Sequence, residues 1–162
     1  MDNKNKSCDN TSLYNSASDI HHHLNMDYRM KILEIEMSIH QARQTRGNTK
    51  VQRYFNSTPI KNAFARWMVY GVYTSKFYMI SELVREMHSN RQTISTMINE
   101  CEAEGYIIVK RVGATVSCQA TPLLVEAMEV YCEWRKELTK STIGTAYNNL
   151  VQFEKLMQKR FA

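Results

Sequence analysis

A short stretch beginning at Arg91 carries polar side chains that can form hydrogen bonds with the edges of nucleic-acid bases. Arginine can donate a pair of hydrogen bonds to guanine, glutamine or asparagine can pair with adenine, and hydroxyl groups can contact bases or phosphates. The candidate contact residues are Arg91, Gln92, Thr93, Ser95, Thr96 and Asn99. No acidic residue occurs from Asn90 to Asn99, and the glutamates at 100, 102 and 104 lie at the far end. This distribution favours insertion of the first half of a helix into the major groove of DNA.

Apolar residues in the same stretch predict a helix that packs against a shorter helix before it. Ile94, Met97, Ile98 and Cys101 recur at helical spacing and should pack against Leu83, Val84 and Met87. We therefore expect helices over Ile80–His88 and Arg91–Glu104. Ser89-Asn90 forms the turn between them, and Gly105 ends the second helix. This layout is that of a helix-turn-helix, whose second helix is shaped to lie in the major groove.

The residues from Tyr106 to Thr121 predict a β-hairpin after the second helix. Gly113-Ala114 can form its tight turn, and polar and apolar residues alternate along the returning arm. Lys110 and Arg111 lie near this turn, within reach of flanking phosphates or the minor groove. The expected fold class is therefore mainly α with a small β-hairpin wing, a winged helix-turn-helix.

Longer helices are expected on both sides of this region. The pattern from Leu24 to about Gln44 is helical and apolar on two sides, so this helix needs two partners, one of which is a second subunit. Ser57-Thr58-Pro59 begins a helix that runs to about Thr74, and Pro122 begins one that runs to about Thr139. Ser141-Thr142 caps the last helix. We expect the N- and C-terminal helices to form a dimerisation device.

Aromatic residues recur along the helix that begins at Pro59. We interpret this stripe as part of the core, because buried aromatic rings dominate the packing of domains of this size. The alternative is a ligand pocket lined by Trp67, Tyr70 and Tyr73.

The order of these elements resembles the MarR family of dimeric winged-helix transcription regulators. The matching motifs are Ile80-Ser81-Glu82-Leu83, the segment 91–98, the exit Glu102-Ala103-Glu104-Gly105-Tyr106-Ile107, and Ala120-Thr121-Pro122. The resemblance covers Leu24 to Phe161, and its specific motifs occupy residues 80–122. It implies a homodimer on a pseudo-palindromic operator, with the six candidate contact residues in the groove and Lys110 and Arg111 on the wing.

The resemblance also carries one departure and one open question. The wing tip here is only Val112-Gly113-Ala114-Thr115, whereas the family usually has a longer loop with an Asp-Arg-Arg type signature. Specificity is therefore expected to rest on the helix alone. Many relatives bind small phenolic or acidic effectors, and no residue of this sequence identifies such a ligand.

Length and composition bound the domain organisation. A chain of 162 residues, of which 43% are hydrophobic, suits one domain with a real core. We expect residues 1–20 to be a disordered tail and residues 21–162 to form the winged helix-turn-helix domain, with its DNA-reading lobe at about residues 58–122. The sequence has no run of 18 apolar residues and no secretory signal, so we expect a cytoplasmic protein without membrane contact.

The charge distribution favours a polyanionic partner. The net charge is +5, and seven Lys or Arg residues occur from Met37 to Ser81 without any Asp or Glu. The alternative is an ordinary solvated helix face. The four cysteines are widely spaced and form no CxxC pair, so neither a zinc site nor a cofactor is expected.

These patterns leave three functional hypotheses. The first is sequence-specific binding of double-stranded DNA by a dimeric regulator, a repressor. The second is a winged-helix adaptor that binds another protein. The third and weakest is an enzyme, because the five histidines have no nearby nucleophile pattern and no Gly-rich phosphate loop is present. The operator, the regulated process and the effector do not follow from the sequence.

Overall fold

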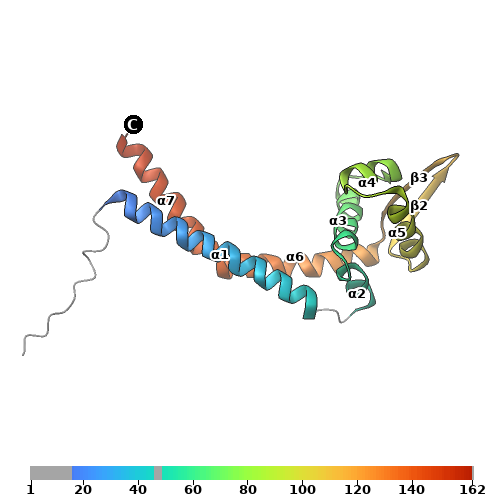
Figure 1. Ribbon diagram of the computed structural model, residues 1–162, viewed down its shortest axis with the longest axis horizontal. Helices are drawn as coiled ribbons and strands as arrows, with labels where there is room; N and C mark the ends of the chain where they lie inside the picture. The colour runs from blue at the N-terminus through green and yellow to red at the C-terminus, as the bar shows by residue number, and fades with distance from the viewer. Residues whose placement is uncertain (1–15, 46–48, 162) are drawn as a thin grey trace, which may run out of the picture. The chain divides into compact units, whose positions relative to one another are not determined.

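The computed structural model describes residues 16–45 and 49–161, which are mostly helical with one small antiparallel sheet (Figure 1). The elements in chain order are α1 (Ala17–Thr45), α2 (Lys50–Asn56), α3 (Pro59–Tyr73), β1 (Tyr78–Met79), α4 (Ile80–Glu86), α5 (Arg91–Ala103), β2 (Ile107–Val112), β3 (Thr115–Ala120), α6 (Pro122–Thr142) and α7 (Gly144–Phe161). No described helix combines the length and hydrophobicity that a membrane crossing requires. A helix-turn-helix followed by a hairpin defines a winged helix-turn-helix fold, as the sequence predicted.

The chain divides into two compact units, which we describe separately. The winged-helix unit runs from Ile39 to Lys136 and contains the sheet and the helix-turn-helix. The terminal-helix unit consists of the described residues within 1–38 and 137–162. Helices α1 and α6 contribute residues to both units.

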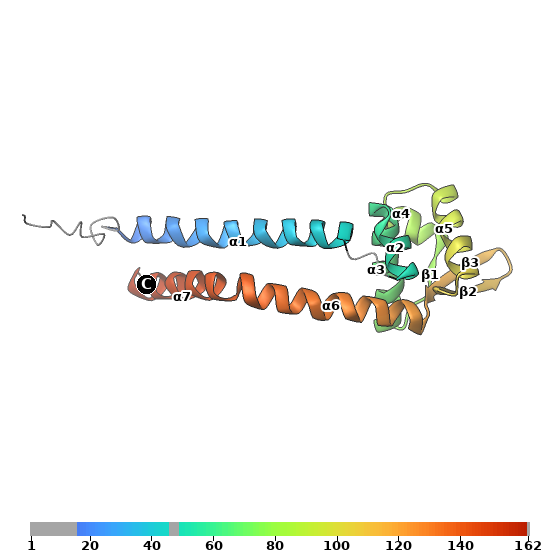
Figure 2. The ribbon, with the colours of Figure 1, turned by 90° about the horizontal axis from the view of Figure 1, so that it is seen from below.

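The sheet of the winged-helix unit joins the hairpin to a third, very short strand (Figure 2). Strand β3 lies between β1 and β2, with Tyr78 opposite Cys118 and Val112 opposite Thr115. Only Gly113 and Ala114 connect β2 to β3, and Gly113 has a φ of 59°, which glycine adopts without strain. The hairpin prediction is thus confirmed. The sequence did not predict β1, because a two-residue strand exists only through its pairing with β3.

The core of this unit forms where α3, α4, α5 and α6 meet the sheet. Its fully buried side chains include Phe64, Met68, Leu83, Ile94, Ile98 and Leu124. The predicted apolar face of α5 is therefore confirmed. The aromatic residues of α3 differ in burial. Trp67 packs against Tyr78 with ring centroids 5.4 Å apart, whereas Tyr70 and Tyr73 are 55% and 62% exposed. The core interpretation is confirmed for Phe64, Trp67 and Met68. Tyr70 and Tyr73 belong to the alternative interpretation, a ligand pocket, and neither lines the cavity described below.

The N-terminal boundary of α1 differs from the sequence prediction. The Ser16 hydroxyl accepts a hydrogen bond from the Asp19 amide at 3.2 Å, which caps a helix that begins at Ala17. Residues 17–20 are therefore helical, although the sequence placed them in the disordered tail. The rest of that predicted tail, residues 1–15, lies outside the described residues.

Two further differences concern helix α2 and the end of α6. The sequence analysis did not identify α2, although Thr49 and Gln52 form a capping box at its start. Helix α6 continues through Thr142 rather than ending near Thr139, and α7 begins at Gly144. The hydroxyls at 141 and 142 therefore belong to the last turn of α6 rather than to a cap of α7.

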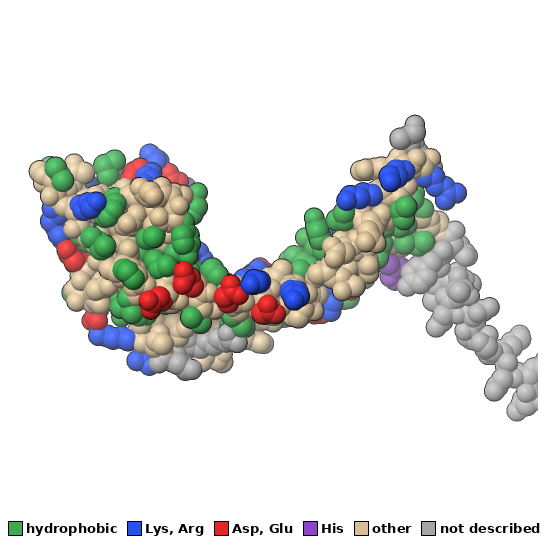
Figure 3. Space-filling model, turned by 180° about the vertical axis from the view of Figure 1, so that it is seen from behind, with side chains coloured by type: hydrophobic (Ala, Val, Ile, Leu, Met, Phe, Trp, Pro, Cys, Tyr) green, Lys and Arg blue, Asp and Glu red, His purple; other side chains and the backbone are tan. Residues whose placement is uncertain are grey.

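In the terminal-helix unit, α1 packs in the opposite direction against α7. His21 Nε2 lies 3.1 Å from Glu154 Oε1, and the rings of Tyr28 and Tyr147 are 6.1 Å apart. Ile35 on this side of α1 is buried. Hydrophobic side chains also reach the surface of the terminal-helix unit (Figure 3). On α1 they form a second line, here called the α1 stripe, whose members are between 44% and 61% exposed: Met26, Met30, Leu33 and Met37.

Candidate nucleic-acid interface

The turn between α4 and α5 is built from two consecutive capping motifs. After α4, His88 adopts the left-handed region with a φ of 47°, and the Ser89 amide donates to the Val84 carbonyl at 3.1 Å. This is the hydrogen-bond pattern of a Schellman motif, which ends a helix sharply. Asn90 then caps α5, because its side-chain oxygen accepts a hydrogen bond from the Thr93 amide at 2.8 Å. Together the two motifs fix the direction in which α5 leaves the turn.

Helix α5 presents two different surfaces along its length. Its apolar face is buried against α4, which leaves the polar face of its first half open. Arg91, Gln92, Thr96 and Asn99 are exposed, whereas Thr93 and Ser95 are half-buried. Among these side chains, Gln92 Nε2 lies 3.5 Å from Thr96 Oγ1, a long contact for a hydrogen bond. The donors and acceptors of this half of the helix are therefore available to a partner.

The second half of α5 is fixed by contacts through its acidic residues. Glu100 accepts a hydrogen bond from the Tyr54 hydroxyl at 2.5 Å and lies 3.6 Å from Lys61 Nζ. Glu104 forms an ion pair with Lys50 at 2.5 Å. The hydrogen bond to Glu104 raises the pKa of Lys50, while burial, followed by the hydrogen bond to Glu100, raises the pKa of Tyr54. These carboxylates therefore connect α5 to α2 and α3.

The third glutamate connects α5 to the wing. Glu102 accepts two hydrogen bonds from the Arg111 guanidinium, with N–O distances of 2.8 and 2.5 Å. The hydrogen bond from Arg111 lowers the pKa of Glu102, so this carboxylate is charged at neutral pH. Lys110 points elsewhere, with its ammonium 3.6 Å from the ring centroid of Phe77. Both predicted wing cations thus contact the protein itself, a feature the sequence analysis did not identify.

The basic stretch from Met37 to Ser81, which contains no Asp or Glu, gains acidic neighbours when the chain folds. Lys50, Lys61 and Lys76 each pair with a glutamate that lies outside the stretch: Glu104, Glu100 and Glu82, respectively. Arg46 lies outside the described residues. Because opposite charges a few ångströms apart cancel at longer range, three of the seven positive charges of this stretch are offset.

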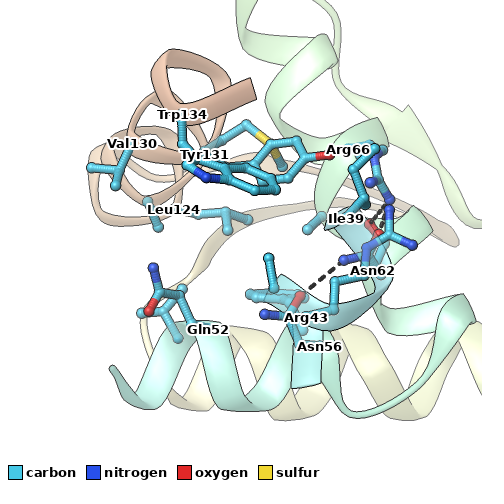
Figure 4. Close-up of a pocket in the computed structure, with 16 residues that line it drawn as sticks. Ile39, Arg43, Gln52, Asn56, Asn62, Arg66, Leu124, Val130, Tyr131 and Trp134 are labelled. Atoms are coloured by element: carbon cyan, nitrogen blue, oxygen red, sulfur yellow. Dashed lines mark hydrogen bonds between the residues drawn. The ribbon is translucent and has the colours of Figure 1, made fainter. Parts of the chain in front are cut away.

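The winged-helix unit also contains a small cavity, lined by residues of α1, α2, α3 and α6 (Figure 4). Its volume is about 100 Å³. Trp134 and Leu124 lie on one side and Arg66, Asn62 and Asn56 on another, with hydrogen bonds joining Arg66 to Asn62 and Asn62 to Asn56. An apolar cavity with one cationic, amide-rich wall suits a small molecule that has an anionic end. The sequence analysis did not identify this cavity, which lacks Tyr70 and Tyr73 among its lining residues.

Metal binding finds no support within the described residues. No group of three or more His, Cys, Asp or Glu side chains in residues 16–45 and 49–161 is arranged to hold a metal ion. Burial raises the pKa of the Cys101 and Cys118 thiols to about 12 each, so both remain protonated and unreactive at neutral pH.

The comparisons with solved structures give low TM-scores at low sequence identity. No protein-family model matches the chain, and no curated protein matches it in sequence. A transcriptional regulator from Thermotoga maritima has a TM-score of 0.49 and 20% identity, over 80% of this chain and 96% of that one. The transcriptional regulator BldR from Sulfolobus solfataricus has a TM-score of 0.45 and 16% identity, over 83% of this chain and 97% of that one. An ArsR family transcriptional regulator has a TM-score of 0.36 and 19% identity, over 52% of this chain and 82% of that one. At values this low, the function of the chain has to be inferred from its own residues.

Proposed function

We propose that this protein is a sequence-specific double-stranded DNA-binding transcription regulator that acts as a MarR-like homodimer. One observation carries the proposal: the polar face of the first half of α5 is accessible and free of carboxylates, while Glu100 and Glu102 in its second half and its C-cap Glu104 are all bound to other elements. Arg91, Gln92 and Asn99 would then read base edges, with hydroxyls from Thr93, Ser95 and Thr96 completing the contacts. Lys110 and Arg111 would lie over the flanking backbone.

The homodimer is inferred from the α1 stripe. Its members follow one another at spacings of four, three and four residues, so they lie along one side of the helix. The side of α1 that holds Tyr28 and Ile35 already packs within the unit, which leaves the stripe without a described partner. A second copy of the chain would bury this stripe against its own and present two reading helices to one duplex. Such a dimer acts as a repressor simply by occupying its operator.

The cavity of the winged-helix unit would hold the effector. Its chemistry suits a small ring with a carboxylate or phenolate group, with the ring near Trp134 and the anion near Arg66. In a Trp67→Phe variant, Trp134 is the only tryptophan, and benzoate should change its fluorescence saturably. Arg66→Gln should weaken this response, and a response unaffected by that substitution would exclude the assignment.

An adaptor that binds protein remains the second candidate function. Two observations favour it: both wing cations contact the protein itself, and Tyr70 and Tyr73 are exposed. Exposed aromatic residues are common in protein interfaces. A protein partner would need none of the base-reading side chains of α5.

The experiment that separates the two functions is selection of bound duplexes from a random pool. A dimeric regulator should enrich a two-fold symmetric motif, and its affinity should fall steeply as salt rises, because bound phosphates release counterions. Enrichment of no motif, together with no retention of any duplex at low salt, would exclude the regulator and leave the adaptor.

A further inference from the structure

The ion pair between Glu102 and Arg111 places a carboxylate where the regulator would need a free cation. The two carboxylate oxygens accept from the two terminal nitrogens of the same guanidinium, at 2.8 and 2.5 Å. A DNA phosphate binds arginine through this same paired geometry. Glu102 therefore occupies the donors that a phosphate would take.

The pair is accessible to solvent and to a large anion. The side chains of Arg111 and Glu102 are 51% and 36% exposed, and they connect the wing strand β2 to the second half of α5. Exposed ion pairs contribute little to folding stability, so a competing anion can displace one. The contact is thus an exchangeable one rather than a fixed part of the core.

We propose that Glu102 is a specificity-determining residue that withholds Arg111 from sequence-independent contact with DNA phosphates. This inference rests on the proposed DNA-binding function. On a random duplex, the negative charge of Glu102 repels the phosphate that would replace it, and no base contact compensates. On the operator, base contacts by α5 hold the backbone against the wing, so the phosphate displaces Glu102. Glu102 acts through Arg111 and does not itself touch DNA.

The test compares Glu102→Gln with a variant of the same net charge. Glutamine preserves the size of the side chain and removes the charge. Glu133→Gln is the control, because Glu133 lies on α6 in an exposed pair with Lys136 and away from the wing and α5. The binding constants of each variant for a selected operator and for a random duplex are measured at several salt concentrations.

The expected result is a change in the salt dependence on random DNA. One additional phosphate contact steepens the slope of log K against log salt by about 0.9, so a fourfold rise in salt weakens binding about 3.5-fold more than in the parent protein. Glu102→Gln should show this change and a lower ratio of operator to random affinity, whereas Glu133→Gln should show neither. Glu102→Asp, which keeps the charge, should keep the parental slope.

A second substitution separates this role from simple bracing of the wing. Arg111→Ala should leave the random-DNA slope of the parent unchanged, but it should remove the steeper slope of Glu102→Gln. A bracing role would alter the thermal midpoint of both single variants without altering the slope. If the parent binds DNA and Glu102→Gln matches Glu133→Gln, this inference is overturned and the proposed function stands. If the parent binds no duplex, both are overturned.

Discussion

At the scale of the residue, the proposed recognition of DNA depends most directly on Arg91. It is exposed at the first position of α5, and within the described part of the chain its guanidinium has no recorded ion-pair or hydrogen-bond partner. We expect Arg91→Ala to weaken operator binding by about 1–3 kcal/mol and to relax specificity at one base position, because a bidentate contact is lost. Titration of the selected operator measures the effect. Arg160→Ala, which removes an exposed cation from α7, is the control and should leave specificity unchanged.

Gly71 is a residue whose small size the fold requires. A Cβ atom added there would lie 2.6 Å from the Lys76 carbonyl oxygen and 3.2 Å from the Tyr78 ring. Alanine normally stabilises a helix relative to glycine by up to about 1 kcal/mol, but a backbone clash of this size requires a shift that costs about 1–3 kcal/mol. We expect Gly71→Ala to lower the free energy of unfolding in urea denaturation.

A glycine at the start of α7 provides the matched control for this substitution. No described atom lies within 4 Å of a Cβ built on Gly144, and its φ is not in the left-handed region. Gly144→Ala should therefore stabilise the protein by about 0.4–1 kcal/mol. Equal effects of the two substitutions would contradict the close approach at Gly71.

At the scale of the element, the cap of α5 contributes to stability and lies beside the proposed DNA-contacting surface. Asn90→Ala removes the acceptor for the Thr93 amide and should destabilise the protein by about 1 kcal/mol. Asn90→Asp keeps a capping oxygen and adds a negative charge beside the reading surface. We expect this variant to retain its urea midpoint while its affinity for duplex DNA falls. Unchanged DNA affinity in Asn90→Asp would argue that phosphates do not approach the start of α5.

The sequence predicted the elements whose signals are local. The helix beginning at Arg91 was predicted from the turn at Ser89-Asn90, an apolar face of regular spacing and a terminal glycine, and the structure confirms all three. Gly113-Ala114 likewise marks the hairpin turn. Helix α2 was missed because seven residues show too little periodicity to separate a helix from a loop. Strand β1 was missed because its only support is a partner about 40 residues away.

The candidate site was predicted as a list of residues but not as a set of contacts. Spacing identified the exposed face of α5, because the apolar face of the same helix defines it. It did not show that Arg111 pairs with Glu102 or that Lys110 lies over Phe77. Those contacts depend on how the hairpin of β2 and β3 packs beside α5 and β1, which no local pattern encodes.

At the scale of the whole molecule, the basic stretch shows that the order of charges in a sequence does not by itself predict where charge lies on the folded protein. Three of its lysines pair with glutamates of α4 and α5, so charges that are separate in sequence are neighbours in space. The net charge of +5 remains, but these three pairs reduce the positive charge that residues 37–81 can offer to a polyanion.

The dimer makes a prediction at the same scale. We expect the double variant Met30→Gln/Leu33→Gln to dissociate more readily, because each buried apolar side chain contributes about 1.5–3 kcal/mol. Sedimentation should show a dimer dissociation constant raised at least a hundredfold. The control, Arg29→Gln/Glu36→Gln, changes two exposed residues of α1 outside the stripe and should sediment as the parent does. A parent protein that sediments as a monomer would exclude the homodimer.

The short length of the exposed part of α5 limits how much information one protomer can extract from a genome. Residues 91–99 rise about 13 Å along the helix axis, which faces roughly four base pairs. Four base-pair positions distinguish only about 256 sequences. Any one of these sequences occurs by chance thousands of times in a genome of the order of 10⁶ sites. Two protomers on one operator would distinguish about 65,000 sequences, the square of that number, which reduces the expected chance matches to about 15. If α5 reads DNA as proposed, the brevity of the segment is itself a reason why specific recognition would need two copies of the chain.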